Sequence, residues 1–163
     1  MKHNWEKIPL HIGYYLAGFV DGEGSFNVSF RMRDDYKNGI KMSACFNVSN
    51  KDKVILLYFK KYLECGTLRS RPDGVWYYEV NTLGIIIEKI VPFFKKFSFL
   101  SAKKKNDFSK FIQILDILVS KNPYSFENVM RVMSLRNKMN GGGKRKYTDE
   151  QIMTRFNASK TKE

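Results

Sequence analysis

The sequence predicts a mixed α/β (α+β) fold, a single domain over residues 1–163 in which helices alternate with antiparallel strand pairs. The expected order is αββαββα, followed by extra C-terminal helices. Three observations predict it. Of the 163 residues, 43% are hydrophobic, which is enough for one domain with a hydrophobic core. Two stretches alternate between apolar and polar residues, as strands with one buried face do. The stretches around them have the spacing of amphipathic helices.

The first αββ unit is predicted over residues 10–49. Residues 10–21 have helical spacing and are followed by two glycines. In residues 25–33 and 41–49 the even-numbered residues are apolar and the odd-numbered ones largely polar. Residues 34–39 are rich in Asp, Asn and Gly, which favour tight turns. We therefore expect the two strands to pair antiparallel.

The second unit begins at residues 49–52, where a hydroxyl is followed three positions later by an acid, as in a capping box. The helix that follows is expected to stop at Gly66. Strands are predicted over 67–71 and 75–81, around a Pro-Asp-Gly turn. A helix over 83–91 is expected to end at the following proline.

The C-terminal third is predicted to be helical. A long amphipathic helix follows the lysines at 103–105 and ends at 122–123, where Asn precedes Pro. A further helix is predicted over 125–139. The domain core is thus expected at about residues 8–140, and residues 141–163 form a basic linker and a last helix.

Charge narrows the class of partner. The chain has 29 Lys and Arg against 16 Asp and Glu, a net charge of +13, which favours a polyanion and nucleic acid over a membrane surface. No apolar run is long enough to span a membrane.

Cys45 and Cys65 are too few for a disulfide framework and are expected to be inert, partly buried thiols. The charged N-terminus lacks a signal peptide's apolar segment, which predicts an intracellular protein. The Lys-, Asn- and Ile-rich composition is typical of AT-rich genomes and is compatible with an organelle such as a mitochondrion or chloroplast.

Residues 16–24, LAGFVDGEG, combine glycines and acids at a helix end. Gly18 and Gly22 are four residues apart, so they share a face on which another helix can approach closely. Each glycine costs helix stability of roughly 0.5–1 kcal/mol, which a closely packed partner helix would offset. Asp21 and Glu23 lie at the negative end of the helix dipole, which indicates a cation there. The alternative from these residues alone is a glycine-rich helix end with solvated acids.

These residues, with the Ser25-Phe26 that follows, resemble the signature of the LAGLIDADG homing endonucleases. The αββαββα order agrees with that family's fold, which has a saddle-shaped antiparallel sheet. A single copy of the motif implies the homodimeric branch, in which two motif helices pack across a two-fold axis. The resemblance implies these interface residues: Leu16, Gly18, Phe19, Asp21 and Gly22.

The resemblance also implies a catalytic centre. It gives Glu23 the position that binds the catalytic metal, beside the backbone carbonyl of Gly22, although Asp is commoner there in close single-motif relatives. Two Glu23 carboxylates at the dimer seam would share divalent cations, and Mg²⁺ suits such oxygen ligands and phosphodiester hydrolysis. Asp21 is expected to stabilise the helix end.

Three further residues match helper positions of the family. Asn50 aligns with a polar position that orders water near the scissile phosphate, and its alternative role is a helix N-cap. Lys103 and Lys104 both match a lysine that polarises the water or steadies the phosphate, and the spacing does not choose between them. An arginine present in some members is replaced by Val54.

The polar face of the sheet is expected to lie in the DNA major groove, where Arg reads guanine and Asn reads adenine. Basic residues of the linker would contact phosphates, which position the protein without specifying sequence. The residues expected to contact DNA are Asn27, Ser29, Arg31, Arg33, Lys41, Ser43, Asn47, Ser49, Arg69, Arg71 and Tyr77 on the sheet, and Lys144, Arg145 and Lys146 in the linker.

The resemblance implies a homodimeric, Mg²⁺-dependent endonuclease that cuts both strands of a long pseudo-palindromic DNA site. It would leave short 3′ overhangs and promote the mobility of its host intron or intein. The alternative is a non-cleaving maturase that binds the host intron RNA with the same scaffold. A DNA-binding repressor is a third reading, but it has no need for an acid at the dimer seam.

Overall fold

The computed structural model describes residues 5–36, 38–143 and 145–160. Its elements, in chain order, are η1 (Trp5–Lys7), α1 (Leu10–Glu23), β1 (Gly24–Met32), β2 (Ile40–Asn50), α2 (Lys53–Leu63), β3 (Thr67–Ser70), β4 (Trp76–Val80), α3 (Leu83–Ile85), the π-helical η2 (Ile86–Ile90), α4 (Val91–Lys96), α5 (Ala102–Leu118), α6 (Phe126–Asn137), η3 (Asn140–Gly142) and α7 (Asp149–Lys160).

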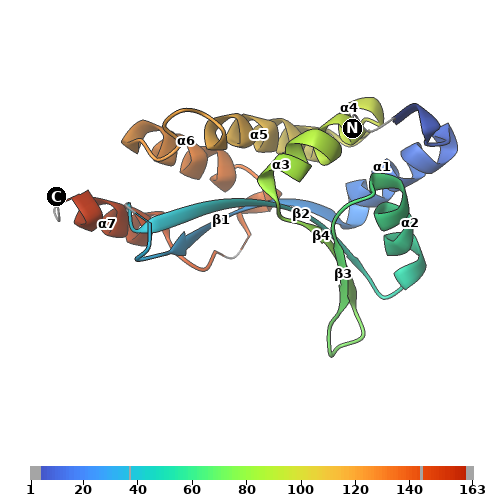
Figure 1. Cartoon of the computed structure of the whole chain (residues 1–163), viewed down its shortest axis with the longest axis horizontal. Helices are drawn as coiled ribbons and strands as arrows, with labels where there is room; N and C mark the ends of the chain where they lie inside the picture. Colours follow the sequence, from blue (N-terminus) through green and yellow to red (C-terminus); the bar gives the residue numbers. More distant parts are fainter. Residues whose placement is uncertain (1–4, 37, 144, 161–163) are drawn as a thin grey trace.

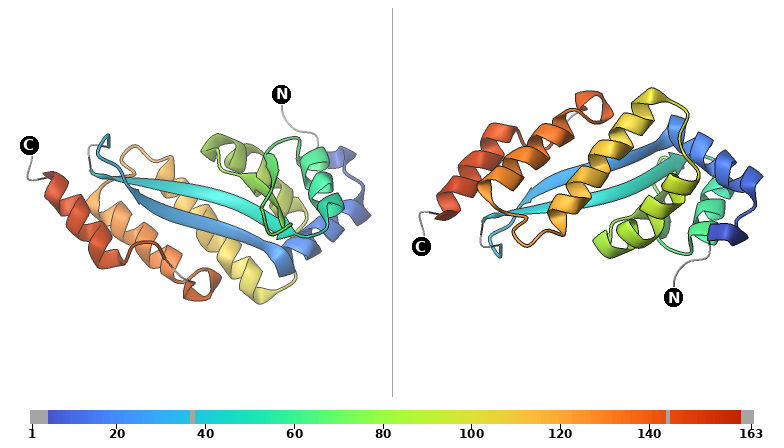
Figure 2. Two further views of the ribbon diagram at one scale, coloured as in Figure 1. Left: turned by 90° about the horizontal axis from the view of Figure 1, so that it is seen from below. Right: turned by 90° about the horizontal axis from the view of Figure 1, so that it is seen from above.

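The four strands form one curved antiparallel sheet in the order β1-β2-β4-β3 (Figure 1). The β1–β2 pairing runs from Gly24 opposite Val48 to Met32 opposite Ile40. Helices α5, α6 and α3–α4 cover one face of the sheet, whereas no helical layer formed by the described residues covers the other (Figures 1 and 2). Helices α1 and α2 lie at the end where β1 begins, and α7 lies beside α6 at the edge of β1. The predicted α+β fold and strand pairing are confirmed.

Phe26 occupies the centre of the core, between the sheet and the helices. Its side chain is fully buried, and its ring centroid lies 5.0–5.8 Å from those of five other phenylalanines. These partners come from β2, from α4 and the segment after it, and from α5: Phe46, Phe94, Phe99, Phe108 and Phe111. This cluster holds the start of β1 firmly against α5, and the junction between α1 and β1 is thereby positioned.

Pro92 does not end its helix, contrary to the prediction. Elements α3, η2 and α4 form one continuous helical segment from Leu83 to Lys96. The N–H of Val91 bonds to the carbonyl of Ile86, five residues back, in a π-type turn. Pro92 therefore falls at the first positions of α4, where its missing N–H is tolerated.

Two helix starts also differ from the sequence interpretation. The capping box at residues 49–52 does not form, because Asp52 is the N-cap of α2 and accepts a hydrogen bond from the N–H of Val54. Helix α5 begins at Ala102 rather than after the lysines, with Ser101 as its N-cap. The lysines at 103–105 therefore lie in the first turn of α5.

The two cysteines are free and partly buried, as predicted. Burial, with a contribution from the nearby Glu79 charge, raises the pKa of the Cys45 thiol to about 11. Burial also raises the pKa of Cys65, whose Sγ lies 3.6 Å from the hydroxyl of Tyr78. Both groups are therefore protonated and weakly nucleophilic at neutral pH. In the part of the chain that the structure describes, no helix has the length and apolarity to cross a membrane.

Candidate active site and sheet surface

Glu23 is the last residue of α1, and its side chain is exposed at the junction with β1. The chain passes from helix to strand at Gly24, which is extended (φ −86°, ψ 156°) and donates its N–H to the carbonyl of Val20. A β-carbon on Gly24 would lie 2.5 Å from Cγ1 of Val20, so only glycine fits this turn. The sharp junction presents Glu23 to solvent at the end of the sheet.

Lys104 lies directly at this junction, and Lys103 does not. The side chain of Lys104 is 9% exposed, and its Nζ donates a hydrogen bond to the carbonyl oxygen of Gly24 at 2.5 Å. Burial lowers the pKa of Lys104, while the nearby carboxylates of Asp107 and Asp21 oppose that shift. Lys103, one position earlier on α5, is exposed. The fold thus distinguishes two lysines that spacing left equivalent.

Asp21 positions Lys104 through Ser101. One oxygen of Asp21 accepts the hydroxyl of Ser101 at 2.6 Å, and the other accepts the N–H groups of Leu100 and Ser101, both at 3.1 Å. The hydroxyl oxygen of Ser101 in turn accepts the N–H of Lys104. Burial opposes ionisation of Asp21, but these hydrogen bonds outweigh it and lower the pKa of the carboxyl. Asp21 therefore ties the end of α1 to the start of α5.

Asn50 lies at the same end of the sheet. It ends β2 two residues beyond Val48, which pairs with Gly24. Its Oδ1 accepts the N–H of Asp52 at 2.8 Å, so Asn50 closes a local turn and is not the helix N-cap. Its amide nitrogen is left for other contacts, and a catalytic role for Asn50 remains a prediction.

The glycine face of α1 is open. A β-carbon on Gly18 or Gly22 would meet no neighbouring atom within 4 Å. Phe19 is half-buried, with its ring 6.3 Å from that of Phe59. Leu16 was predicted at the interface, but it is completely buried in the chain's own core and presents no surface to a partner. Its position on the helix, two residues before Gly18, turns it toward the sheet.

Exposed apolar side chains extend this open face beyond the motif. Tyr15 on α1 is 59% exposed, and its spacing from the glycines could have revealed it from sequence. Tyr14, the residue before it on α1, is 54% exposed. The remaining side chains come from α2 and from the residue before Ser101, and they are adjacent to α1 only through the fold. This exposed set, called here the α1 end face, consists of Tyr14, Tyr15, Val54, Leu57, Tyr58 and Leu100. Contiguous patches of exposed apolar side chains are typical of interaction surfaces.

The strand register brings the predicted sheet residues onto one face. Partners in antiparallel strands project on the same side of the sheet. The paired positions on the open face are Ser29 with Ser43, Arg31 with Lys41, Asn27 with Cys45, Ser49 with Tyr77, Tyr77 with Arg69, and Asn47 with Glu79. Arg71 follows β3, and its guanidinium lies 4.3 Å from the centroid of the Tyr77 ring, on the same side. We call this the open sheet surface.

Two of the arginines predicted to contact DNA form ion pairs with carboxylates of the same chain. Both nitrogens of the Arg33 fork bond to Asp35, at 2.6 and 2.7 Å, in the turn after β1. Arg69 donates to both oxygens of Glu79, at 2.9 and 2.8 Å, across the β3–β4 pair. Sequence reasoning missed these partners, although the alternation of β4 places Glu79 on the face of Tyr77. The ion pair with Glu79 orients the Arg69 guanidinium on the open sheet surface, and the pair with Asp35 holds Arg33 in the turn after β1.

Of the linker residues predicted to contact DNA phosphates, one is engaged within the chain. The guanidinium of Arg145 donates to the carbonyl of Arg136 at 2.6 Å, at the end of α6. Lys146 is exposed, with its Nζ 5.3 Å from the Tyr147 ring centroid. Lys144 lies outside the described residues. Arg145 therefore serves an internal contact that the charge pattern alone did not indicate.

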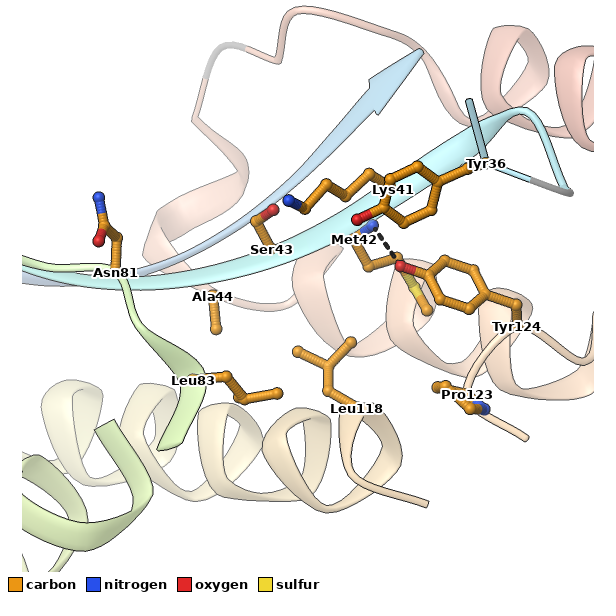
Figure 3. A pocket seen from close by; sticks show the side chains of 10 residues that line it. All are labelled: Tyr36, Lys41, Met42, Ser43, Ala44, Asn81, Leu83, Leu118, Pro123 and Tyr124. Carbon is orange, nitrogen blue, oxygen red and sulfur yellow. Dashed lines mark hydrogen bonds between the residues drawn. The ribbon is translucent and has the colours of Figure 1, made fainter. Parts of the chain in front are cut away.

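A pocket lies beside β2, where this strand extends beyond its pairing with β4 (Figure 3). The hydroxyl of Tyr124 accepts the N–H of Met42 there at 3.3 Å. Lys41 and Ser43 form part of its lining and also belong to the open sheet surface. None of the four predicted catalytic residues lines it, so the pocket is not the proposed reaction centre. Among the described residues, no group of three His, Cys, Asp or Glu side chains could hold a metal ion.

The structure places an exposed acid at the end of a helix that carries a glycine face, at one end of an open antiparallel sheet. This is the arrangement expected from the resemblance of the motif to the LAGLIDADG endonucleases. The family model for the LAGLIDADG endonucleases matches residues 16–115. The chain belongs to this family.

Individual relatives agree with this assignment. The chain is 37% identical over 84 residues to DNA endonuclease I-CvuI of Chlorella vulgaris, covering 48% of this chain and 52% of that protein. It is 26% identical over 146 residues to homing endonuclease I-ApeII of Aeropyrum pernix, covering 85% and 86%. The structure of I-SmaMI bound to an uncleaved DNA target in the presence of calcium ions superposes with a TM-score of 0.77 and 26% identity, covering 87% of this chain and 48% of that one. The matches thus span about half the length of I-CvuI and I-SmaMI.

Proposed function

We propose that this chain is a homodimeric, Mg²⁺-dependent homing endonuclease that cuts both strands of a long pseudo-palindromic DNA site and leaves short 3′ overhangs. The observation that carries the proposal is the junction of α1 and β1, where the exposed Glu23 adjoins Gly24, whose carbonyl binds the buried ammonium of Lys104. An acid and a lysine beside an open basic sheet suit phosphodiester hydrolysis. The names of I-CvuI and I-ApeII, and the DNA in the I-SmaMI structure, support it.

The α1 end face supports pairing with a second copy. Gly18 and Gly22 leave space for a helix to approach closely, and the exposed apolar side chains around them would be buried by it. A two-fold axis along α1 would bring two Glu23 carboxylates together and join two open sheet surfaces. Two copies would then supply the span that I-SmaMI holds in one chain, of which this chain covers 48%.

The residues at the seam fit a hard divalent cation. Glu23 is exposed and its carboxylate has no partner among the described residues. The carbonyl of Gly22 lies in the last turn of α1, where carbonyls lack helical partners and the dipole is negative. Glu23 and Gly22 would hold the ion, which would stabilise charge on the attacking and leaving oxygens.

The remaining site residues would act on phosphate and water. Lys104, held against Gly24, places a fixed positive charge beside the seam, where it would attract the scissile phosphate. The amide nitrogen of Asn50, whose oxygen is engaged by Asp52, would donate a hydrogen bond to water. Arg31, Lys41 and the ion-paired Arg69 would face the bases from the open sheet surface.

The biological role is proposed as mobility of a host intron or intein. The name homing endonuclease given to I-ApeII supports this. An organellar compartment is proposed from the AT-rich type of composition.

The test is cleavage selection from a randomised DNA library with Mg²⁺, for the natural chain and for Glu23→Gln. We expect the natural chain to cut a nearly palindromic site, and Glu23→Gln to bind that site without cutting it. Undiminished cleavage by Glu23→Gln would remove Glu23 from the metal site. Splicing of the host intron that depends on the protein, with no DNA cleavage, would favour the maturase instead.

A further inference from the structure

Asn140 lies outside the sheet, yet its side chain reaches the edge of β1. It follows α6 and adopts the left-handed backbone conformation (φ 53°), which asparagine tolerates better than most residues. Its N–H donates to Oδ1 of Asp107 on α5 at 3.3 Å. These two features direct the Asn140 amide toward β1, the edge strand of the sheet.

The orientation of the Asn140 amide follows from its partner. Its Nδ2 donates to the backbone carbonyl of Phe26 at 2.8 Å, and a carbonyl oxygen can only accept. The nitrogen of Asn140 therefore faces the Phe26 carbonyl, and its Oδ1 lies 3.5 Å from the hydroxyl of Ser25 on the same strand. The same Nδ2 lies 3.5 Å from Oδ1 of Asn27, the next residue of the strand.

A second donor acts on the same oxygen of Asn27. The hydroxyl of Ser25 has one proton and two acceptors within reach, Oδ1 of Asn27 at 3.2 Å and Oδ1 of Asn140 at 3.5 Å, and it donates to the nearer one, Asn27. With Asn140 and Ser25 both donating to its oxygen, the Asn27 amide has one favourable orientation. Asn27 pairs with Cys45 on the open sheet surface, so its Nδ2 is the group left to face a ligand there.

We infer that Asn140 is a positioning residue that makes Asn27 a hydrogen-bond donor toward DNA. This inference rests on the proposed function, in which the open sheet surface lies in the major groove. An asparagine with a free amide offers adenine both an acceptor and a donor. With its oxygen engaged by Ser25 and Asn140, Asn27 instead favours a base whose exocyclic group in the major groove is an acceptor, namely O6 of guanine or O4 of thymine. It disfavours the amino groups of adenine and cytosine at that position.

The experiment measures base preference at each position of the half-site. Once library selection has identified the site, binding is compared for all four base pairs at every position, with calcium in place of Mg²⁺. The natural chain should prefer an acceptor at one position per half-site by about tenfold, which corresponds to one hydrogen bond of about 1.4 kcal/mol.

Two variants distinguish the contact of Asn27 with a base from the positioning of Asn27 by Asn140. Asn27→Asp keeps the size of the side chain and its bonds from Ser25 and Asn140, but its outward atom becomes an acceptor. The preference at that position should invert toward adenine and cytosine. Asn140→Ala removes the positioning bond, and the preference should fall to within about threefold while other positions keep theirs. Asn157→Ala, an exposed asparagine on α7, is the matched control and should change no position.

The outcomes are distinct. If the natural chain selects no DNA sequence, the proposed function fails before this inference is reached. A selected site with the same preference at every position for the natural chain, Asn27→Asp and Asn140→Ala would overturn the inference and leave the function standing. Inversion by Asn27→Asp with full selectivity in Asn140→Ala would also overturn the positioning role of Asn140. Circular dichroism of each variant shows that a lost preference does not come from unfolding.

Discussion

The ammonium of Lys104 lies 2.5 Å from the carbonyl oxygen of Gly24, the residue that follows Glu23. The two residues are 80 positions apart in the chain. Their contact joins the start of α5 to the junction of α1 and β1, and it places a buried ammonium against the residue that follows the exposed acid. The candidate site is therefore built from two segments. The α1–β1 junction supplies the acid, and the start of α5 supplies the lysine.

Lys104→Met should reduce DNA cleavage by about 100-fold or more, because it removes a fixed charge that would stabilise the transition state. DNA affinity should change only a few-fold. The matched variant is Lys103→Met, which alters an exposed lysine one position earlier and should leave cleavage within about threefold. Single-turnover cleavage with Mg²⁺ measures both rates. A larger loss in Lys103→Met than in Lys104→Met would reverse the assignment.

Asp21→Asn should lower the free energy of unfolding at neutral pH by about 1–2 kcal/mol, since the Asp21 carboxylate accepts three hydrogen bonds from Leu100 and Ser101. The folded state lowers the pKa of Asp21 below its ordinary 3.8. Its stabilisation is therefore complete above pH 3.8 and is lost as the pH falls through the folded pKa. Urea unfolding at several pH values should show the difference between the two proteins shrinking in acid. A difference that is constant with pH would contradict this role.

Gly18→Leu should shift the proposed dimer to monomer, because the side chain would occupy the space that a second α1 needs. Within one chain the leucine has room, and the folded monomer should gain about 0.5–1 kcal/mol from helix propensity. Gly84→Leu is the control, since Gly84 is also exposed, helical and free of neighbours within 4 Å. Sedimentation velocity over a range of concentrations reports the association. An unchanged dimer in Gly18→Leu would exclude pairing through the glycine face.

Asp149→Ala should destabilise the fold by about 2–3 kcal/mol, because it removes the carboxylate from a buried guanidinium. Arg136 is 3% exposed, its terminal nitrogen lies 2.7 Å from Oδ1 of Asp149, and its guanidinium packs over the ring of Phe30. Thermal and urea unfolding measure the loss. Asp116→Ala, which alters an exposed acid on α5, should have an effect below about 0.5 kcal/mol. Equal effects from the two variants would show that the Arg136 pair contributes little.

Much of the fold followed from local pattern. The alternation of residues 25–33 and 41–49 predicted the hairpin, and the structure pairs these strands with their apolar residues inward. The prediction that the helix ends at Pro92 was wrong because a π-type turn before the proline lets the helix continue. The types of the residues in this segment do not predict such a turn. Leu16 was wrongly placed at the interface because a motif names positions without saying which side of the helix packs inward.

What the sequence by itself determined is the class of the domain, since a nine-residue motif, a period-two pattern and a charge of +13 are local or additive properties. Tertiary structure alone decided which of the two lysines lies at the junction of α1 and β1. Lys103 and Lys104 are neighbours of the same type, and only the packing of α5 against β1 buries one of them beside Gly24. The same holds for Asn140, whose contact with Phe26 and Asn27 crosses more than a hundred residues. Hydrogen-bond partners of this kind depend on how distant segments pack, and that information is not carried by spacing along the chain.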